Sequence, residues 1–124
     1  MIPTAFNRPE YLPIAYHSIV SQETDHEIEL IVGCPSEKVE AVKAVLPAGA
    51  SVIAESTELG LAKKLDALLK ETSADCEFLA WLGDDDTLLP GSLAAATQAL
   101  RKSIRASMAF GGCDYIDAAG RILF

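Results

Sequence analysis

The sequence is poor in the residues that characterise disulfide-rich, nucleic-acid-binding and membrane-spanning proteins. Its 124 residues include only three cysteines (Cys34, Cys76 and Cys113), an odd count without a CxxC pair. There are 10 lysines and arginines against 18 aspartates and glutamates, and the formal net charge is −8. No apolar run reaches the roughly 20 residues of a membrane span, and the N-terminus does not read as a signal peptide. We therefore expect a cytoplasmic protein with reduced cysteines, no transmembrane segment and no nucleic acid as partner.

The common phosphate-binding loops and zinc motifs are also missing. Neither GxxxxGK[ST] nor GxGxxG occurs in the chain, so a nucleotide would depend on a metal and on scattered side chains. His17 and His26, the only histidines, stand at no zinc-ligand spacing relative to the cysteines. Hydrophobic residues make up 50% of the chain, which is enough for one domain with one core.

Apolar runs and helix-like periods alternate along the chain. One helix is predicted to begin at Pro9, and another to be capped by Ser36, with Val39 and Val42 facing inward. A helix is also predicted from Pro90 to about Lys102. A further helix is predicted over residues 58–71, with Leu61, Leu65 and Leu68 inward. Strands are predicted over residues 1–6, 27–33, 51–55, 76–82 and 107–116, and a turn at 118–121 leads into a returning strand at 122–124.

This order predicts an α/β fold with a mostly parallel sheet and helices on both faces. The run CEFLAWL (residues 76–82) is almost continuously apolar, as in a strand that is covered on both faces. Three aspartates, Asp84, Asp85 and Asp86, follow it. Ligands of such sheets bind beyond the carboxyl ends of the strands, so the aspartates favour a binding site over an acidic surface turn.

Clustered carboxylates serve several chemistries, and most of them do not match this stretch. An EF-hand loop that starts at Asp84 would place Leu88 and Ala95 at ligand positions, so that interpretation fails. A phosphatase DxDxT motif misses by one residue. What remains is a metal held by one or two carboxylates, with phosphate and water as its other ligands, which is how Mg²⁺ usually binds nucleotides.

Taken together, several stretches resemble the nucleotide-sugar-binding half of a family 2 glycosyltransferase with the Rossmann-like GT-A fold. They are IPTAFNRPEYL, IELIV, GLAKKLDALL, FLAWLGDDDTLLPGSL and FGGCDYIDAAGRI, and they extend over essentially the whole chain. The resemblance implies one domain, residues 1–124, that binds a nucleotide diphosphate sugar, with a UDP-sugar as the expected donor. It also implies a truncated copy, because the family domain continues past residue 124 into an acceptor half with the catalytic base.

Carried over position by position, the resemblance assigns roles to six residues. The metal, Mn²⁺ or Mg²⁺, would be held in a DXD-like motif by Asp85 as principal ligand and Asp86 as a second one. The nucleotide would contact Asp84 through its ribose, and its base would lie near the start of the chain. The residues implied for nucleotide binding are Thr4, Phe6, Arg8 and Asp84.

Two departures from the family pattern concern the donor. Cys34 and Pro35 stand where the family usually has base-contacting aspartates, and a thiol is a poor replacement for a carboxylate acceptor. In the third helix, the dipeptide at 65–66 replaces the Arg-Asn of many members, and Lys63 or Lys64 is left to supply positive charge to a diphosphate. The usual motif also has Asp where Gly83 stands.

Three hypotheses for function share this fold. The chain is part of an enzyme that transfers a sugar from a nucleotide diphosphate to an acceptor hydroxyl, with the catalytic residue unknown. Alternatively, it is a non-catalytic module that binds nucleotide and metal, or it is a fold remnant with a structural role.

Overall fold

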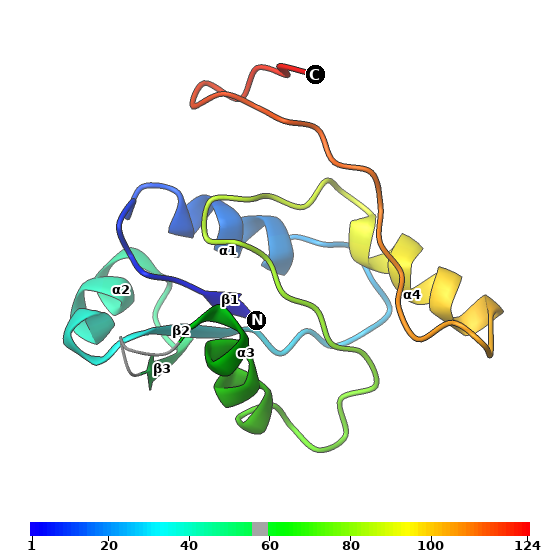
Figure 1. The fold of residues 1–124 in the computed structure, drawn as a ribbon, viewed down its shortest axis with the longest axis horizontal. Coiled ribbons are helices and arrows are strands. Elements are labelled where there is room, and N and C mark those ends of the chain that lie inside the picture. Colours follow the sequence, from blue (N-terminus) through cyan, green and yellow to red (C-terminus); the bar gives the residue numbers. More distant parts are fainter. Residues whose placement is uncertain (56–59) are drawn as a thin grey trace.

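The computed structural model describes residues 1–55 and 60–124. Its centre is a parallel sheet of three strands in the order β1 (Ile2–Pro3), β2 (Ile31–Pro35) and β3 (Ser51–Glu55) (Figure 1). In the middle of the sheet Val32 pairs with Ile2 on one side and with Val52 on the other. The predicted α/β fold with a parallel sheet is confirmed.

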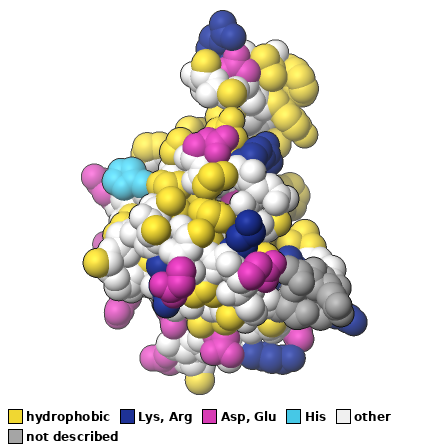
Figure 2. Space-filling view, turned by 90° about the vertical axis from the view of Figure 1, so that its left-hand side faces the viewer, with side chains coloured by type: hydrophobic (Ala, Val, Ile, Leu, Met, Phe, Trp, Pro, Cys, Tyr) yellow, Lys and Arg dark blue, Asp and Glu magenta, His cyan; other side chains and the backbone are white. Residues whose placement is uncertain are grey.

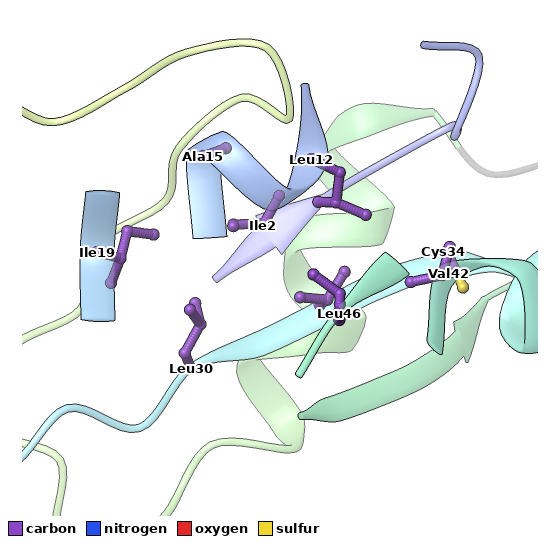
Figure 3. Close-up of a cluster of buried hydrophobic side chains, with 9 residues drawn as sticks. Ile2, Leu12, Ala15, Ile19, Leu30, Cys34, Val42 and Leu46 are labelled. Atoms are coloured by element: carbon purple, nitrogen blue, oxygen red, sulfur yellow. The ribbon is translucent and has the colours of Figure 1, made fainter. Parts of the chain in front are cut away.

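Helices lie on both faces of this sheet. Side chains alternate along a strand, so Val32 and Cys34 of β2 point to one face and Gly33 to the other. The first face carries α1 (Leu12–Val20) and α2 (Val39–Val45), which follows a short 3₁₀ turn at Ser36–Lys38. This face forms the main buried cluster (Figure 3), which consists of Ile2, Leu12, Ala15, Ile19, Leu30, Val32, Cys34, Val42 and Leu46.

The opposite face is covered by α3 (Leu61–Lys70). The contact is close because β2 has a glycine there: a Cβ on Gly33 would lie 2.6 Å from Cδ2 of Leu68, which is fully buried. Leu61 was predicted to point inward, but its residue surface is 63% exposed. Residues 58 and 59 of the predicted helix lie outside the described residues.

The prediction of a buried strand at residues 76–82 was wrong. The segment has no regular strand, and Leu79 and Trp81 are 51% and 63% exposed. It still follows the free edge of β1: the Met1 amino group donates to the carbonyl of Ala80 (2.9 Å), and the Leu82 N–H donates to the carbonyl of Met1 (3.1 Å). β1 is two residues long and Pro3 has no N–H, so few backbone groups are available to extend this pairing.

Several predicted element ends were also wrong. The first helix begins at Leu12 instead of Pro9, and the proline in its first turn is Pro13. Ser36 does not cap a helix; its hydroxyl donates to the carbonyl of Glu55 at 3.4 Å. Residues 27–30 are not in the strand, because β1 and β3 provide partners only from residue 31 onward. The last helix, α4 (Ser92–Lys102), agrees with its prediction to within two residues.

The chain after α4 extends away from the body (Figure 1). The predicted turn at 118–121 is present, and Ile116 and Ile122 form an antiparallel bridge across it, but the predicted strand at 107–116 is absent. Apolar side chains gather on the surface of this arm (Figure 2), and Ile104 is fully exposed. Within the described residues, no helix is both long enough and apolar enough to cross a membrane.

Candidate functional site

The candidate site lies at the edge of the sheet where the parallel strands end. Thr4 directly follows β1, and its N–H donates to the carbonyl of Gly33 in β2 at 2.8 Å. Asp84 follows the segment that is hydrogen-bonded to Met1, so it reaches the same edge from the other side of β1. The ends of parallel strands are where α/β proteins bind their ligands.

The hydroxyl of Thr4 connects the two parts of the site. It donates a hydrogen bond to a carboxylate oxygen of Asp84, 80 residues later in the sequence, and it accepts the N–H of Phe6 at 2.8 Å. Thr4 is only 3% exposed, so these bonds are shielded from water. The structure therefore brings together Thr4 and Asp84, two of the residues implied by the resemblance.

Phe6 has an unusual backbone conformation beside this hydroxyl. Its φ is +53°, a region that bulky residues rarely adopt and that costs on the order of 1–3 kcal/mol. The ring is half-buried and packs against the main core cluster. Stacking on a nucleobase, which the resemblance implies for Phe6, would therefore have to use the part of the ring that the core leaves uncovered.

Arg8 pairs with Asp85. Its guanidinium donates to a carboxylate oxygen of Asp85, and the two side chains are 59% and 36% exposed. The guanidinium carbon also lies 5.5 Å from the centre of the Tyr11 ring. The sequence did not predict this pair, because it suggested the nucleotide as the partner of Arg8 and a metal as the partner of Asp85.

Gly83 leaves a space beside two carboxylates. A Cβ at this position would lie 2.6 Å from Oδ2 of Asp86 and 3.3 Å from Oδ1 of Asp85, so both oxygens approach the same point. The N–H of Asp86 donates to the carbonyl of Gly83 at 3.2 Å and closes the turn that holds them. An aspartate at position 83, as in the usual family motif, would force the Asp86 carboxylate to move.

The donor set fits a divalent metal bound together with phosphate. The described residues include no group of three or more His, Cys, Asp or Glu side chains that could hold a metal ion alone. Asp85 and Asp86 supply hard oxygen ligands on one side only. Mg²⁺ bound through one or two carboxylates and substrate phosphates has this arrangement.

Two adjoining hollows lie beside the aspartates. The larger has a volume of about 410 Å³, within the range of small-molecule sites, and it is lined by Pro3, Leu61, Trp81, Leu82, Gly83, Asp84 and Asp86. The smaller, of about 170 Å³, shares Pro3 and Leu61 with it and adds Thr4, Ala5 and Lys64. The pair of hollows thus has carboxylates at one end and a lysine at the other.

Sequence reasoning missed Trp81 and Leu61 as lining residues. Leu61 matched the apolar period of a core-facing helix, and Trp81 matched a buried strand, so nothing in the pattern set them apart. The structure also separates two neighbouring lysines: Lys64 is half-buried and lines the smaller hollow, whereas Lys63 is exposed and lines neither hollow.

Glu55, at the carboxyl end of β3, is a buried acid that sequence reasoning also missed. The residue is 4% exposed, and none of the described residues forms a hydrogen bond with either carboxyl oxygen. Burial raises the pKa of Glu55 above its ordinary 4.5, and the nearby charge of Lys64 partly opposes this shift. The proton is therefore held more tightly in the folded chain than in the unfolded one.

Comparison with known proteins agrees with this geometry. A family model described as Glycosyl transferase family 2 matches residues 1–121. The chain belongs to this family, and it is a glycosyltransferase-like α/β module. A search of the curated proteins finds no match.

Glu55 makes a pH dependence testable. Since the pKa of Glu55 is raised on folding, the unfolding free energy should fall as the pH rises from about 4.5 through the folded-state pKa, and should then level off. Glu55→Gln removes this pH-dependent contribution. The unfolding free energy of the variant, measured with urea, should therefore rise relative to that of the wild type across this pH range.

Glu29 is a comparison with the opposite sign. The backbone N–H of Ser73 and the Cys76 thiol lower the pKa of Glu29, so its contribution to stability is present above the ordinary pKa and is lost as the pH falls. The unfolding free energy of Glu29→Gln should therefore fall relative to that of the wild type as the pH rises from the lowered pKa of Glu29 to about 4.5, a range below the one for Glu55. The same pH trend in both variants would show that folding does not raise the pKa of Glu55.

Proposed function

We propose that this chain binds the donor of a glycosyl transfer reaction, a nucleoside diphosphate sugar, together with Mn²⁺ or Mg²⁺. A UDP-sugar is the expected donor, and an acceptor hydroxyl receives the sugar. The observation that carries the proposal is the meeting of Thr4, Arg8 and the three aspartates at one edge of the sheet, beside a hollow of about 410 Å³. Residues 1–124 form one donor-binding domain in this proposal.

The roles of the residues follow their positions. Asp85 and Asp86 hold the metal, which neutralises charge on the leaving diphosphate when it is bound. Asp84, fixed by the Thr4 hydroxyl, accepts hydrogen bonds from the ribose. Thr4 and Phe6 position the base side of the nucleotide. Transfer also needs a general base for the acceptor hydroxyl, and no described residue is assigned to that role.

A second candidate is a module that binds nucleotide and metal without transfer. One point supports it: Asp85 and Asp86 could still hold a metal, whereas none of the described residues is assigned as the general base that transfer needs. Transfer of sugar from UDP-glucose or UDP-N-acetylglucosamine to an added acceptor would exclude this candidate. Binding without transfer would favour it. The cytoplasm remains the expected compartment in both cases.

The first prediction for this site concerns metal dependence. Without a phosphate-binding loop, UDP should stabilise the chain only when Mn²⁺ or Mg²⁺ is present. Ligand at 100 times its dissociation constant adds about 2.7 kcal/mol, which raises the melting temperature of a domain of this size by several degrees. Melting curves with UDP, GDP, ADP and CDP, each with metal or with chelator, measure this effect.

Asp85→Asn is the variant that tests the metal ligand, and Asp114→Asn in the exposed arm is its control. The amide oxygen is neutral and a weaker ligand, so Asp85→Asn should abolish the metal-dependent shift while Asp114→Asn keeps it. The stability of the metal-free Asp85→Asn variant should change little. The loss of its exposed ion pair and the relief of repulsion among the aspartates are both small, and they act in opposite directions. A full shift in Asp85→Asn would remove Asp85 from the metal site.

The second prediction uses the two neighbouring lysines. Lys64 lines the smaller hollow and Lys63 does not, so only Lys64 is placed to contact a diphosphate. Lys64→Met should weaken the binding of UDP with Mn²⁺ about tenfold, the loss of one charge-assisted hydrogen bond. Lys63→Met removes the same charge and should stay within about twofold of the wild type. Equal losses in isothermal titration would show that the charge acts only at long range.

A further inference from the structure

Arg8 occupies a position that the proposed function does not explain. In this structure its guanidinium pairs with Asp85, the residue proposed as the principal metal ligand. A carboxylate that accepts a hydrogen bond from a guanidinium is a weaker ligand for a metal. The positive charge of a nearby guanidinium also repels the metal. Arg8 and the metal therefore compete for the same carboxylate.

We propose that Arg8 changes partners when the site is loaded. In the metal-free chain it holds Asp85, and when a divalent metal binds, it is released and pairs with the diphosphate of the donor. This inference rests on the proposed function and adds a control of metal affinity to the same site. With this exchange, the three aspartates have a positive charge beside them both without and with metal, first the Arg8 guanidinium and then the divalent ion.

The contacts of Arg8 are suited to such an exchange. It lies in the loop between β1 and α1, outside regular secondary structure, and its side chain is 59% exposed. Ion pairs this exposed are weak, so a divalent cation can displace the guanidinium. The carbonyl of Arg8 accepts the N–H of Tyr11 at 3.2 Å, which fixes the backbone of Arg8 near the acidic turn while its side chain changes partner.

The released guanidinium has a suitable new partner in the same place. Its planar group of donors matches phosphate oxygens as well as it matches a carboxylate. The metal would bring the diphosphate to Asp85 and Asp86, the position that Arg8 has just left. One substitution at Arg8 should therefore change the binding of metal and of diphosphate in opposite directions.

A purely structural role predicts a different outcome. If Arg8 only fastens the β1–α1 loop to the acidic turn, removing it should loosen the site and weaken both metal and nucleotide binding. Arg101 is a matched control, because it pairs with Glu77 at 2.7 Å and its guanidinium carbon lies 5.5 Å from the Phe78 ring. It forms the same two kinds of contact as Arg8, but its acidic partner lies outside the run of three aspartates.

The experiment uses Trp81 as its reporter. It is the chain's single tryptophan and lines the larger hollow with Asp84 and Asp86, so paramagnetic Mn²⁺ bound there should quench its fluorescence. Titration with Mn²⁺ alone should give Arg8→Gln a dissociation constant about two- to fivefold lower than that of the wild type, the strength of an exposed pair. Arg101→Gln should match the wild type.

The second arm measures UDP binding at saturating Mn²⁺ by calorimetry. Arg8→Gln should bind UDP about three- to tenfold more weakly than the wild type, since one charge-assisted contact is lost. The exchange is overturned if Arg8→Gln binds Mn²⁺ no more tightly than the wild type, or if it binds UDP equally well. Absence of Mn²⁺ quenching in every variant contradicts both this inference and the proposed function. Quenching that Asp85→Asn abolishes, with Arg8→Gln titrating as the wild type does, contradicts only the exchange.

Discussion

The hydrogen bond from the Thr4 hydroxyl to Asp84 is the contact on which the candidate site depends. It joins the end of β1 to a loop 80 residues later. Among the described residues, the backbone bonds between the edge of β1 and the segment before this loop are the two at Met1. The same hydroxyl accepts the N–H of Phe6 and thereby supports a backbone conformation that phenylalanine seldom adopts. One hydroxyl oxygen thus holds both the start of the β1–α1 loop and the acidic turn.

The three neighbouring aspartates can be accommodated because each carboxylate has a different environment. Two like charges about 4 Å apart repel by roughly 4 kcal/mol at an effective dielectric constant near 20, which makes an unrelieved run costly. Asp84 accepts from Thr4, Asp85 pairs with Arg8, and Asp86 turns back over Gly83. The glycine that departs from the usual family motif is what gives the last two carboxylates room.

Much of the fold could be predicted from the sequence, because helical periods and β-branched runs are local signals. The parallel sheet, the burial of Leu68 in α3 and the end of α4 at Lys102 followed from such patterns. Strand pairing was harder. The run at 76–82 has the composition of a buried strand, but a strand exists only where a neighbour offers backbone partners, and β1 offers few.

The contacts of the candidate site were not predictable from the sequence. The resemblance implied Thr4, Arg8 and the three aspartates as site residues, and the structure places these near one another. The partner of Arg8 could not be read from the sequence, because an ion pair between residues 77 positions apart depends on how two loops meet. The burial of Glu55 without a hydrogen-bond partner among the described residues was likewise not predictable. A single acid after a strand is ordinary in a sequence and unusual only when it is buried.

The central claim is that the acidic turn and the β1–α1 loop form one metal-dependent donor site. The most direct measurement is the broadening of backbone amide signals in the NMR spectrum of the ¹⁵N-labelled chain as Mn²⁺ is added in small amounts. We predict that signals of residues 83–87 and 4–8 broaden first and together, while those of α2 and the arm at 103–124 persist. Broadening spread evenly over the acidic surface, with Glu37 and Glu40 affected as early as Asp85, would contradict the claim.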